Sequence, residues 1–147
     1  EKPFTLKVVN GMDANDFAMT ARGNDSHIIQ LNANAFRDEK KLAEEYQKLV
    51  DDGWFVKGTT YRSIVMHEMG HMYANTHKTD IMKICKEVLK TDNSGVIAYV
   101  QKNLSSYSSV FADGTEIISE VFSSFFGGKP KEFEKMFIQK LLQEEEN

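Results

Sequence analysis

The sequence predicts one α+β domain in which a few short strands come first and helices make up the rest. Residues 1–35 alternate β-type segments with turn pairs, whereas apolar residues recur at helical spacing from residue 38 onward. The length of 147 residues is typical of one domain, and no linker or internal repeat divides the chain. We therefore expect a single domain over residues 1–147. Because the first residue is Glu rather than Met, we expect it to be excised or processed from a longer chain.

The N-terminal part holds two segments with β-type residues. Phe4–Val9 ends at the turn pair Asn10-Gly11, and Ser26–Asn32 follows the turn pair Asn24-Asp25. An extended peptide can pair with the open edge of a sheet, and the second segment is one candidate for that edge. The alternative is an ordinary inner strand. The residues expected to bind substrate in the first case are Ile28, Ile29, Gln30 and Leu31.

Six helices are predicted, over residues 38–50, 60–75, 79–89, 96–104, 115–127 and 130–146. The second is capped by Thr59 or Thr60 and carries apolar residues around more than half of its circumference, which is typical of a central, largely buried helix. A Ser-rich loop precedes the fifth helix. For that helix we expect Thr115 as the cap and the pair Gly127-Gly128 as a left-handed end.

The composition excludes several classes of protein. A net charge of −4 provides no electrostatic attraction for nucleic acid or for an anionic membrane. The apolar runs are too short to cross a bilayer, and the one cysteine, Cys85, has no internal disulfide partner. We therefore expect no nucleic-acid partner and no membrane partner. We also expect the protein to be a monomer.

The predicted central helix carries the motif His67-Glu68-Met69-Gly70-His71. Side chains four residues apart lie on one face of a helix, so both imidazoles can bind one metal ion. Glu68 projects about 100° further around the helix, where it can reach a water molecule bound to that ion. The motif therefore predicts one Zn²⁺ per chain, with His67 and His71 as ligands and Glu68 as the general base.

A catalytic zinc site needs a third protein ligand and an open fourth position, and two candidates compete for the third place. His77 has the spacing of proteases that take three His ligands from one motif, but Ala74 stands where those proteases need Gly for a sharp turn. Asn75 can take that turn instead. The rival is Glu116, one helical turn before Glu120 on an otherwise apolar helix. Two buried carboxylates need positive partners, so we favour Glu116 as the ligand and Glu120 as the acceptor of a ligand's ring N–H.

Three motifs in this order resemble the catalytic domain of anthrax lethal factor and its zincin relatives. They are His67–His71, Asn103–Tyr107 and Glu116–Phe122, within a span from Ile28 to Phe126. The group includes the Pro-Pro endopeptidases and the zincin-like domains of bacteriophage minor head proteins, which the chain resembles most. The resemblance implies a zincin-like metallopeptidase with a small N-terminal twisted sheet, an active-site helix and a C-terminal helical part. It also implies a bacterial or phage origin and favours a cytoplasmic or virion-associated protein over a secreted one.

The resemblance also implies roles for individual residues. It agrees with zinc ligation by His67, His71 and Glu116, with Glu68 as the base and with Glu120 as a supporting carboxylate. It adds one role, because Tyr107 matches the phenol that faces the scissile carbonyl. The segment between Tyr107 and the first glutamate is slightly longer than in the family, and the alternative for Tyr107 is a packed loop tyrosine.

The expected function is that of a zinc-dependent metalloendopeptidase, a hydrolase that acts on a peptide or protein substrate. Ile64 lies one turn before His67 on the same helix face and is expected to line the pocket for the residue after the scissile bond. The alternative is a non-catalytic, zinc-stabilised structural or interaction domain of a phage head or toxin protein. The fourth zinc ligand distinguishes the two, because water indicates an enzyme and a protein side chain indicates a structural site.

Overall fold

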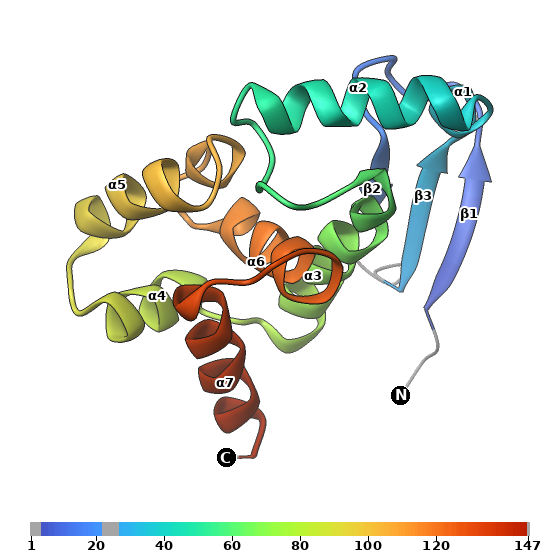
Figure 1. The fold of residues 1–147 in the computed structure, drawn as a ribbon. Coiled ribbons are helices and arrows are strands. Elements are labelled where there is room, and N and C mark those ends of the chain that lie inside the picture. The colour runs from blue at the N-terminus through green and yellow to red at the C-terminus, as the bar shows by residue number, and fades with distance from the viewer. Residues whose placement is uncertain (1–3, 22–26, 147) are drawn as a thin grey trace.

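The computed structural model describes residues 4–21 and 27–146 of the chain. Its strands are β1 (Thr5–Val9), β2 (Ala18–Thr20) and β3 (Ile28–Asn32). Its helices are α1 (Ala33–Phe36), α2 (Glu39–Asp51), α3 (Ile64–His77), α4 (Ile81–Leu89), α5 (Asn93–Asn103), α6 (Thr115–Gly127) and α7 (Glu132–Glu146), with the single turns η2 (Tyr61–Ser63) and η3 (Tyr107–Ser109). Strands come first and helices follow (Figure 1), so the predicted α+β class is confirmed.

The described strands form one small mixed sheet in the order β1-β3-β2 (Figure 1). β1 runs parallel to β3 with Leu6 opposite Ile29, and β2 runs antiparallel to β3 with Thr20 opposite the same residue. The expectation that Ile28–Asn32 forms an edge strand is therefore wrong, because β3 has a paired neighbour on both sides. The expected turn at Asn24-Asp25 lies outside the described residues.

β2 is an edge strand and lies against α3. The sequence does not predict it, because three residues are too few to show a period of two. The carbonyl of Phe17 accepts a hydrogen bond from the N–H of Asn32, and the N–H of Ala21 donates to the carbonyl of Ile28. Because backbone groups alternate in direction along an antiparallel strand, the first and last residues of β2 turn their N–H and C=O toward the open edge. No strand in the described part of the chain pairs with that edge.

Side-chain caps set where several helices begin. The carboxylate of Asp38 caps α2, and Thr60 caps η2, which leads directly into α3. α4 begins after Asp80, whose carboxylate caps it, rather than at Thr79. Asp92 caps α5 in the same way, so that this helix begins three residues earlier than expected.

α6 begins and ends differently from the prediction. Its N-cap is Gly114, at φ 76°, and Thr115 is the first helical residue rather than the cap. The carboxylate of Asp113 accepts a hydrogen bond from the backbone N–H of Thr115 at 3.0 Å and so takes over the capping role. The helix ends at Gly127 as predicted, but Gly128 has φ −141° and is not left-handed.

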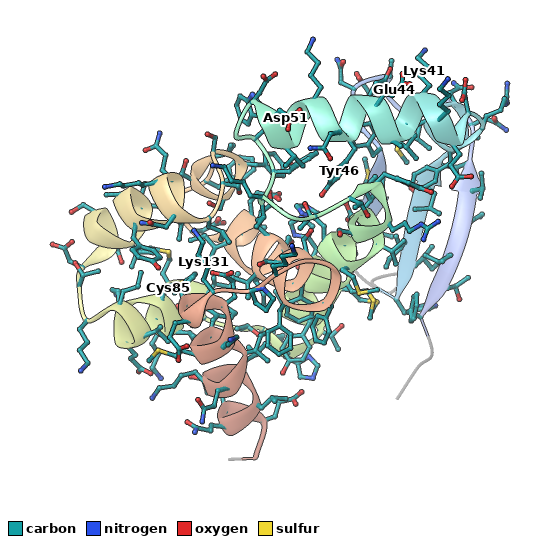
Figure 2. All side chains as sticks on the ribbon, in the orientation of Figure 1. Lys41, Glu44, Tyr46, Asp51, Cys85 and Lys131 are labelled. Atoms are coloured by element: carbon teal, nitrogen blue, oxygen red, sulfur yellow. The ribbon has the colours of Figure 1, made fainter. Side chains whose placement is uncertain are left out.

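α3 and α6 lie side by side at the centre of the molecule (Figure 1). The prediction of a central helix is confirmed, because every residue from Ile64 to Ala74 is buried or half-buried. On one side, α2 packs toward α3 and forms a smaller core, in which Figure 2 shows Tyr46 on the inner side of α2 and Lys41 on its outer side. On the other side, α4, α5, α6 and α7 enclose the larger core, which includes Cys85.

α3 and α6 come closest at Gly70. A methyl group added to Gly70 would lie 2.7 Å from Cα of Ser119 and 2.9 Å from the carbonyl oxygen of Ile118. Both are backbone atoms of α6, so no side chain can rotate away to make room. The absence of a side chain at Gly70 therefore lets the two helices approach closely enough for their polar residues to meet.

We expect Gly70→Ala to lower the free energy of unfolding by about 2 kcal/mol, although alanine is normally the better helix former. The added methyl group overlaps the backbone of α6 and must push the two helices apart. Urea denaturation followed by circular dichroism measures the change. An unchanged or higher stability would show that the helices separate without strain and would contradict the tight crossing.

Candidate metal centre

Two helices bring three ligand-type side chains together. His67 and His71 project from one face of α3, and Glu116 projects toward them from the first turn of α6. Nε2 of His67 lies 3.1 Å from Oε2 of Glu116, and Nε2 of His71 lies 3.2 Å from Oε1 of the same carboxylate. One ligand atom from each residue lies within 4.8 Å of the other two.

One oxygen of the Glu116 carboxylate is available to a cation. Oε2 of Glu116 is buried and has no hydrogen-bond partner among the described residues. The separations of 3.1 and 3.2 Å involve different oxygens of Glu116, so one carboxylate oxygen faces each imidazole. The three residues can therefore hold one metal ion between them.

The electrostatics of the site favour positive charge. Burial by itself lowers the pKa of His67, but the carboxylates of Glu116 and Glu120, with a smaller contribution from Glu68, raise it above its ordinary value. Burial acts on Glu116 in the opposite sense, and the two imidazoles outweigh it and hold the pKa of Glu116 below its ordinary value. A cation placed among these carboxylates would be stabilised.

Glu120 lies one helical turn after Glu116 and is almost completely buried. Its Oε2 is 3.6 Å from Nδ1 of His67, which is too long for a hydrogen bond but within the range of an ion pair. Its other oxygen accepts a hydrogen bond from the hydroxyl of Ser105 at 3.1 Å. Sequence reasoning missed this role of Ser105, although the residue belongs to the motif Asn103–Tyr107.

A residue of the sheet holds the side chain of Glu68 in place. Its Oε2 accepts a hydrogen bond from the hydroxyl of Thr20 at 2.6 Å, and Thr20 is the buried last residue of β2. Sequence reasoning missed Thr20, because no local pattern links two residues 48 positions apart. The Glu68 carboxylate is therefore fixed beside the ligand group by a residue outside its own helix.

The turn η3 places Tyr107 against His67. The two rings stack with centroids 5.6 Å apart and an interplanar angle of 29°. Two backbone hydrogen bonds tie this turn to the carbonyls of Gly53 and Trp54. Burial and then the charges of nearby carboxylates raise the pKa of Tyr107 well above its ordinary value, so its phenol keeps its proton at neutral pH.

Two cavities meet at these residues. The first, of about 450 Å³, is lined mainly by aromatic and aliphatic side chains, including Ile64. The second, of about 540 Å³, runs along β2 and has a more polar lining. The residues shared by both linings include His67, Glu68 and Tyr107. None of the residues expected from β3 lines either cavity; these are Ile28, Ile29, Gln30 and Leu31.

His77 lies apart from the ligand group. α3 continues without a sharp turn through Ala74 and Asn75 and ends at His77. Nε2 of His77 is 2.9 Å from Oε1 of Glu145, and its ring stacks on Tyr73 with centroids 4.0 Å apart. The alternative in which His77 is the third ligand is therefore wrong, because a straight helix carries it to the far end of α3.

Comparisons with protein-family models, curated proteins and solved structures gave no match. Within residues 4–21 and 27–146, no helix combines the length and the apolar character needed to cross a membrane.

Proposed function

We propose that this protein is a zinc-dependent metalloendopeptidase of the zincin type. The observation that carries the proposal is the convergence of His67, His71 and Glu116 on one point beside the carboxylate of Glu68. Two imidazoles and one carboxylate are a ligand set that zinc takes in hydrolytic enzymes. The likeness of the three motifs to the lethal factor group supports the same function.

Zinc fits the donor set, which combines nitrogen and oxygen ligands of the kind it prefers. A bound zinc ion supplies a Lewis acid that polarises a carbonyl group and lowers the pKa of water from 15.7 to about 7. Among the described residues, only three side chains offer ligand atoms to this point. A fourth position is thereby left for water or substrate.

The protein's own residues transfer the protons. The Glu68 carboxylate accepts a proton from the attacking water molecule as the water oxygen bonds to the carbonyl carbon. It then returns that proton to the nitrogen of the leaving amine as the C–N bond breaks. The protonated phenol of Tyr107 donates a hydrogen bond to the carbonyl oxygen, on which negative charge develops. Glu120 and Ser105 hold His67 and the turn that carries the phenol.

The substrate we propose is an extended peptide with a large apolar side chain next to the scissile bond. The open edge of β2 runs along the second cavity, so a peptide strand can pair with it. The first cavity, where Tyr46 and Phe55 stack with centroids 4.9 Å apart, can take the apolar side chain. In this proposal β2, rather than β3, is the edge strand that pairs with the peptide.

The alternative of a non-catalytic, zinc-stabilised domain has less support. A structural zinc site is closed by four protein ligands, whereas the described residues offer three. Such a site also has no use for a buried carboxylate that is held beside the ligands, as Glu68 is held by Thr20. The two cavities that reach the ligand group favour an enzyme in the same way.

Cleavage of a peptide library by the zinc-loaded protein tests the proposal. We expect bonds inside the peptides to be cut, activity to disappear when a chelator removes zinc, and activity to return when zinc is added back. Mass spectrometry of the products identifies the cleaved bonds. A stoichiometric zinc complex that cuts no peptide in the library would contradict the proposal and favour the structural alternative.

Zinc affinity is expected to rise with pH. In the metal-free protein the raised pKa of His67 keeps its imidazole protonated at neutral pH, and zinc binds only the neutral ring. Binding near pH 7 should therefore release about one proton from this residue, and the affinity should increase up to tenfold per pH unit. Calorimetry in buffers of different ionisation enthalpy counts the protons. A zinc affinity that does not change between about pH 6 and 8 would contradict this expectation.

A further inference from the structure

The hydroxyl of Thr20 donates a hydrogen bond to the carboxylate of Glu68. Its Oγ1 lies 2.6 Å from Oε2 of Glu68 and 3.0 Å from the backbone carbonyl oxygen of the same residue. A hydroxyl has one hydrogen, so it donates to one of these atoms at a time. The shorter contact is to the carboxylate, and a hydrogen bond to an ionised group is the stronger kind.

No other described residue hydrogen-bonds this carboxylate. Glu68 has three side-chain torsions, and neither its own helix nor α6 provides a donor to it in the described part of the chain. An unrestrained glutamate would lose its orientation to rotamer exchange. The carboxylate lies where both cavities meet, so its direction decides whether it faces the reacting water.

Thr20 also belongs to the strand that borders the second cavity. Its side chain points to α3, while its backbone N–H and C=O turn to the open edge of the sheet. A peptide paired with this edge would therefore contact the backbone of the residue whose side chain holds Glu68. The edge strand and the general base are coupled through one residue.

We propose that Thr20 is a positioning residue that holds the Glu68 carboxylate in the orientation needed to accept a proton from water. This inference rests on the proposed function, because it assigns Thr20 a role in that reaction. The role is geometric, since Thr20 donates to Glu68 and does not itself touch the ligand group. It predicts that the hydroxyl matters and that the methyl group of Thr20 does not.

The comparison of Thr20→Val with Thr20→Ser tests the role. Val keeps the shape and removes the hydroxyl, so we expect kcat to fall about 10- to 100-fold while KM stays within about twofold. Ser keeps the hydroxyl and should restore kcat to within about threefold of the wild type. Zinc content should be unchanged in both. A Thr20→Val protein with the wild-type kcat would overturn the proposal, and Thr20→Ala provides the same comparison if the valine variant does not fold.

Ser124→Ala is the matched control. The Ser124 hydroxyl also donates to a buried carboxylate, that of Glu134 at 2.9 Å, but this pair joins α6 to the start of α7 away from the two cavities. We expect this variant to unfold at a lower urea concentration than the wild type and to keep its kcat. An equal loss of kcat in Ser124→Ala would show that the effect of Thr20→Val is general destabilisation, and would overturn the proposal.

A second measurement needs no activity. In the metal-free protein, a double-mutant cycle of Thr20→Val and Glu68→Ala in urea denaturation measures the coupling between the two side chains. We expect Thr20→Val to destabilise the Glu68→Ala background less than it destabilises the wild type, because in that background the hydroxyl keeps only the weaker contact to the backbone carbonyl of residue 68. Additive effects would overturn the proposed contact even if the protein is an active peptidase. A wild-type protein that cleaves no peptide would instead remove the proposed function, and a non-additive cycle would then still establish the contact.

Discussion

Replacing Glu68 by glutamine is expected to leave zinc bound and to lower kcat by about 10³-fold, within the range that general acid–base catalysis contributes. Glutamine has nearly the same size and still offers an oxygen to the Thr20 hydroxyl, so the packing around residue 68 is preserved. Its amide cannot accept a proton from water at neutral pH. Steady-state kinetics on a cleaved peptide, together with the zinc content by mass spectrometry, measure the effect.

Glu134→Gln is the matched control for this experiment. Glu134 is another buried carboxylate that accepts a hydrogen bond from a hydroxyl, but it lies in the first turn of α7 and lines neither cavity at the candidate site. We expect it to keep kcat while losing some stability. A Glu68→Gln protein with full turnover and zinc in place would contradict the assignment of the general base.

Replacing Glu116 by alanine is expected to weaken zinc binding by about 60- to 700-fold. Structural zinc sites bind with about 10–16 kcal/mol over four ligands, so one ligand contributes about 2.5–4 kcal/mol. The carboxylate of Glu116 lies within 3.2 Å of both imidazoles, and its removal leaves two nitrogen ligands without the third donor. Competition with a chelator of known affinity measures the loss, and circular dichroism checks that the fold is kept.

Two further variants provide comparisons for the effect of Glu116→Ala on zinc binding. His77→Ala should bind zinc as the wild type does, because His77 pairs with Glu145 at the end of α3. Glu120→Gln should weaken zinc binding by about 10- to 100-fold, as expected of a residue that interacts with the other ring nitrogen of a ligand histidine. If Glu116→Ala retains wild-type zinc affinity, the third ligand is a different residue and the site must be reassigned.

The candidate ligand residues could be predicted from the sequence because each pair follows a local periodicity. His67 and His71 are four residues apart on one helix, and Glu116 and Glu120 are four apart on another. The apolar neighbours of each pair predicted that both helices are buried. The sequence left open whether Glu116 or His77 is the third candidate ligand. The structure decided against His77, because α3 continues past the site and α6 places Glu116 beside His67 and His71.

The supporting residues could not be located in this way. Thr20 reaches Glu68 across 48 positions, and Ser105 reaches Glu120 across 15. Both are short polar side chains whose hydrogen-bond partners depend on how the elements pack. Neither has a spacing that distinguishes it from the many other Ser and Thr residues of the chain.

The sequence by itself determined the α+β class, most of the helices and the two helix faces that carry the candidate metal ligands. These features depend on periodicity and capping within short stretches of the chain. Only the tertiary structure decided the strand order, the identity of the edge strand beside the site and the residue that holds Glu68. Strand order depends on pairings between distant segments, which no local pattern encodes. The close crossing at Gly70 likewise requires knowledge of which helix lies opposite.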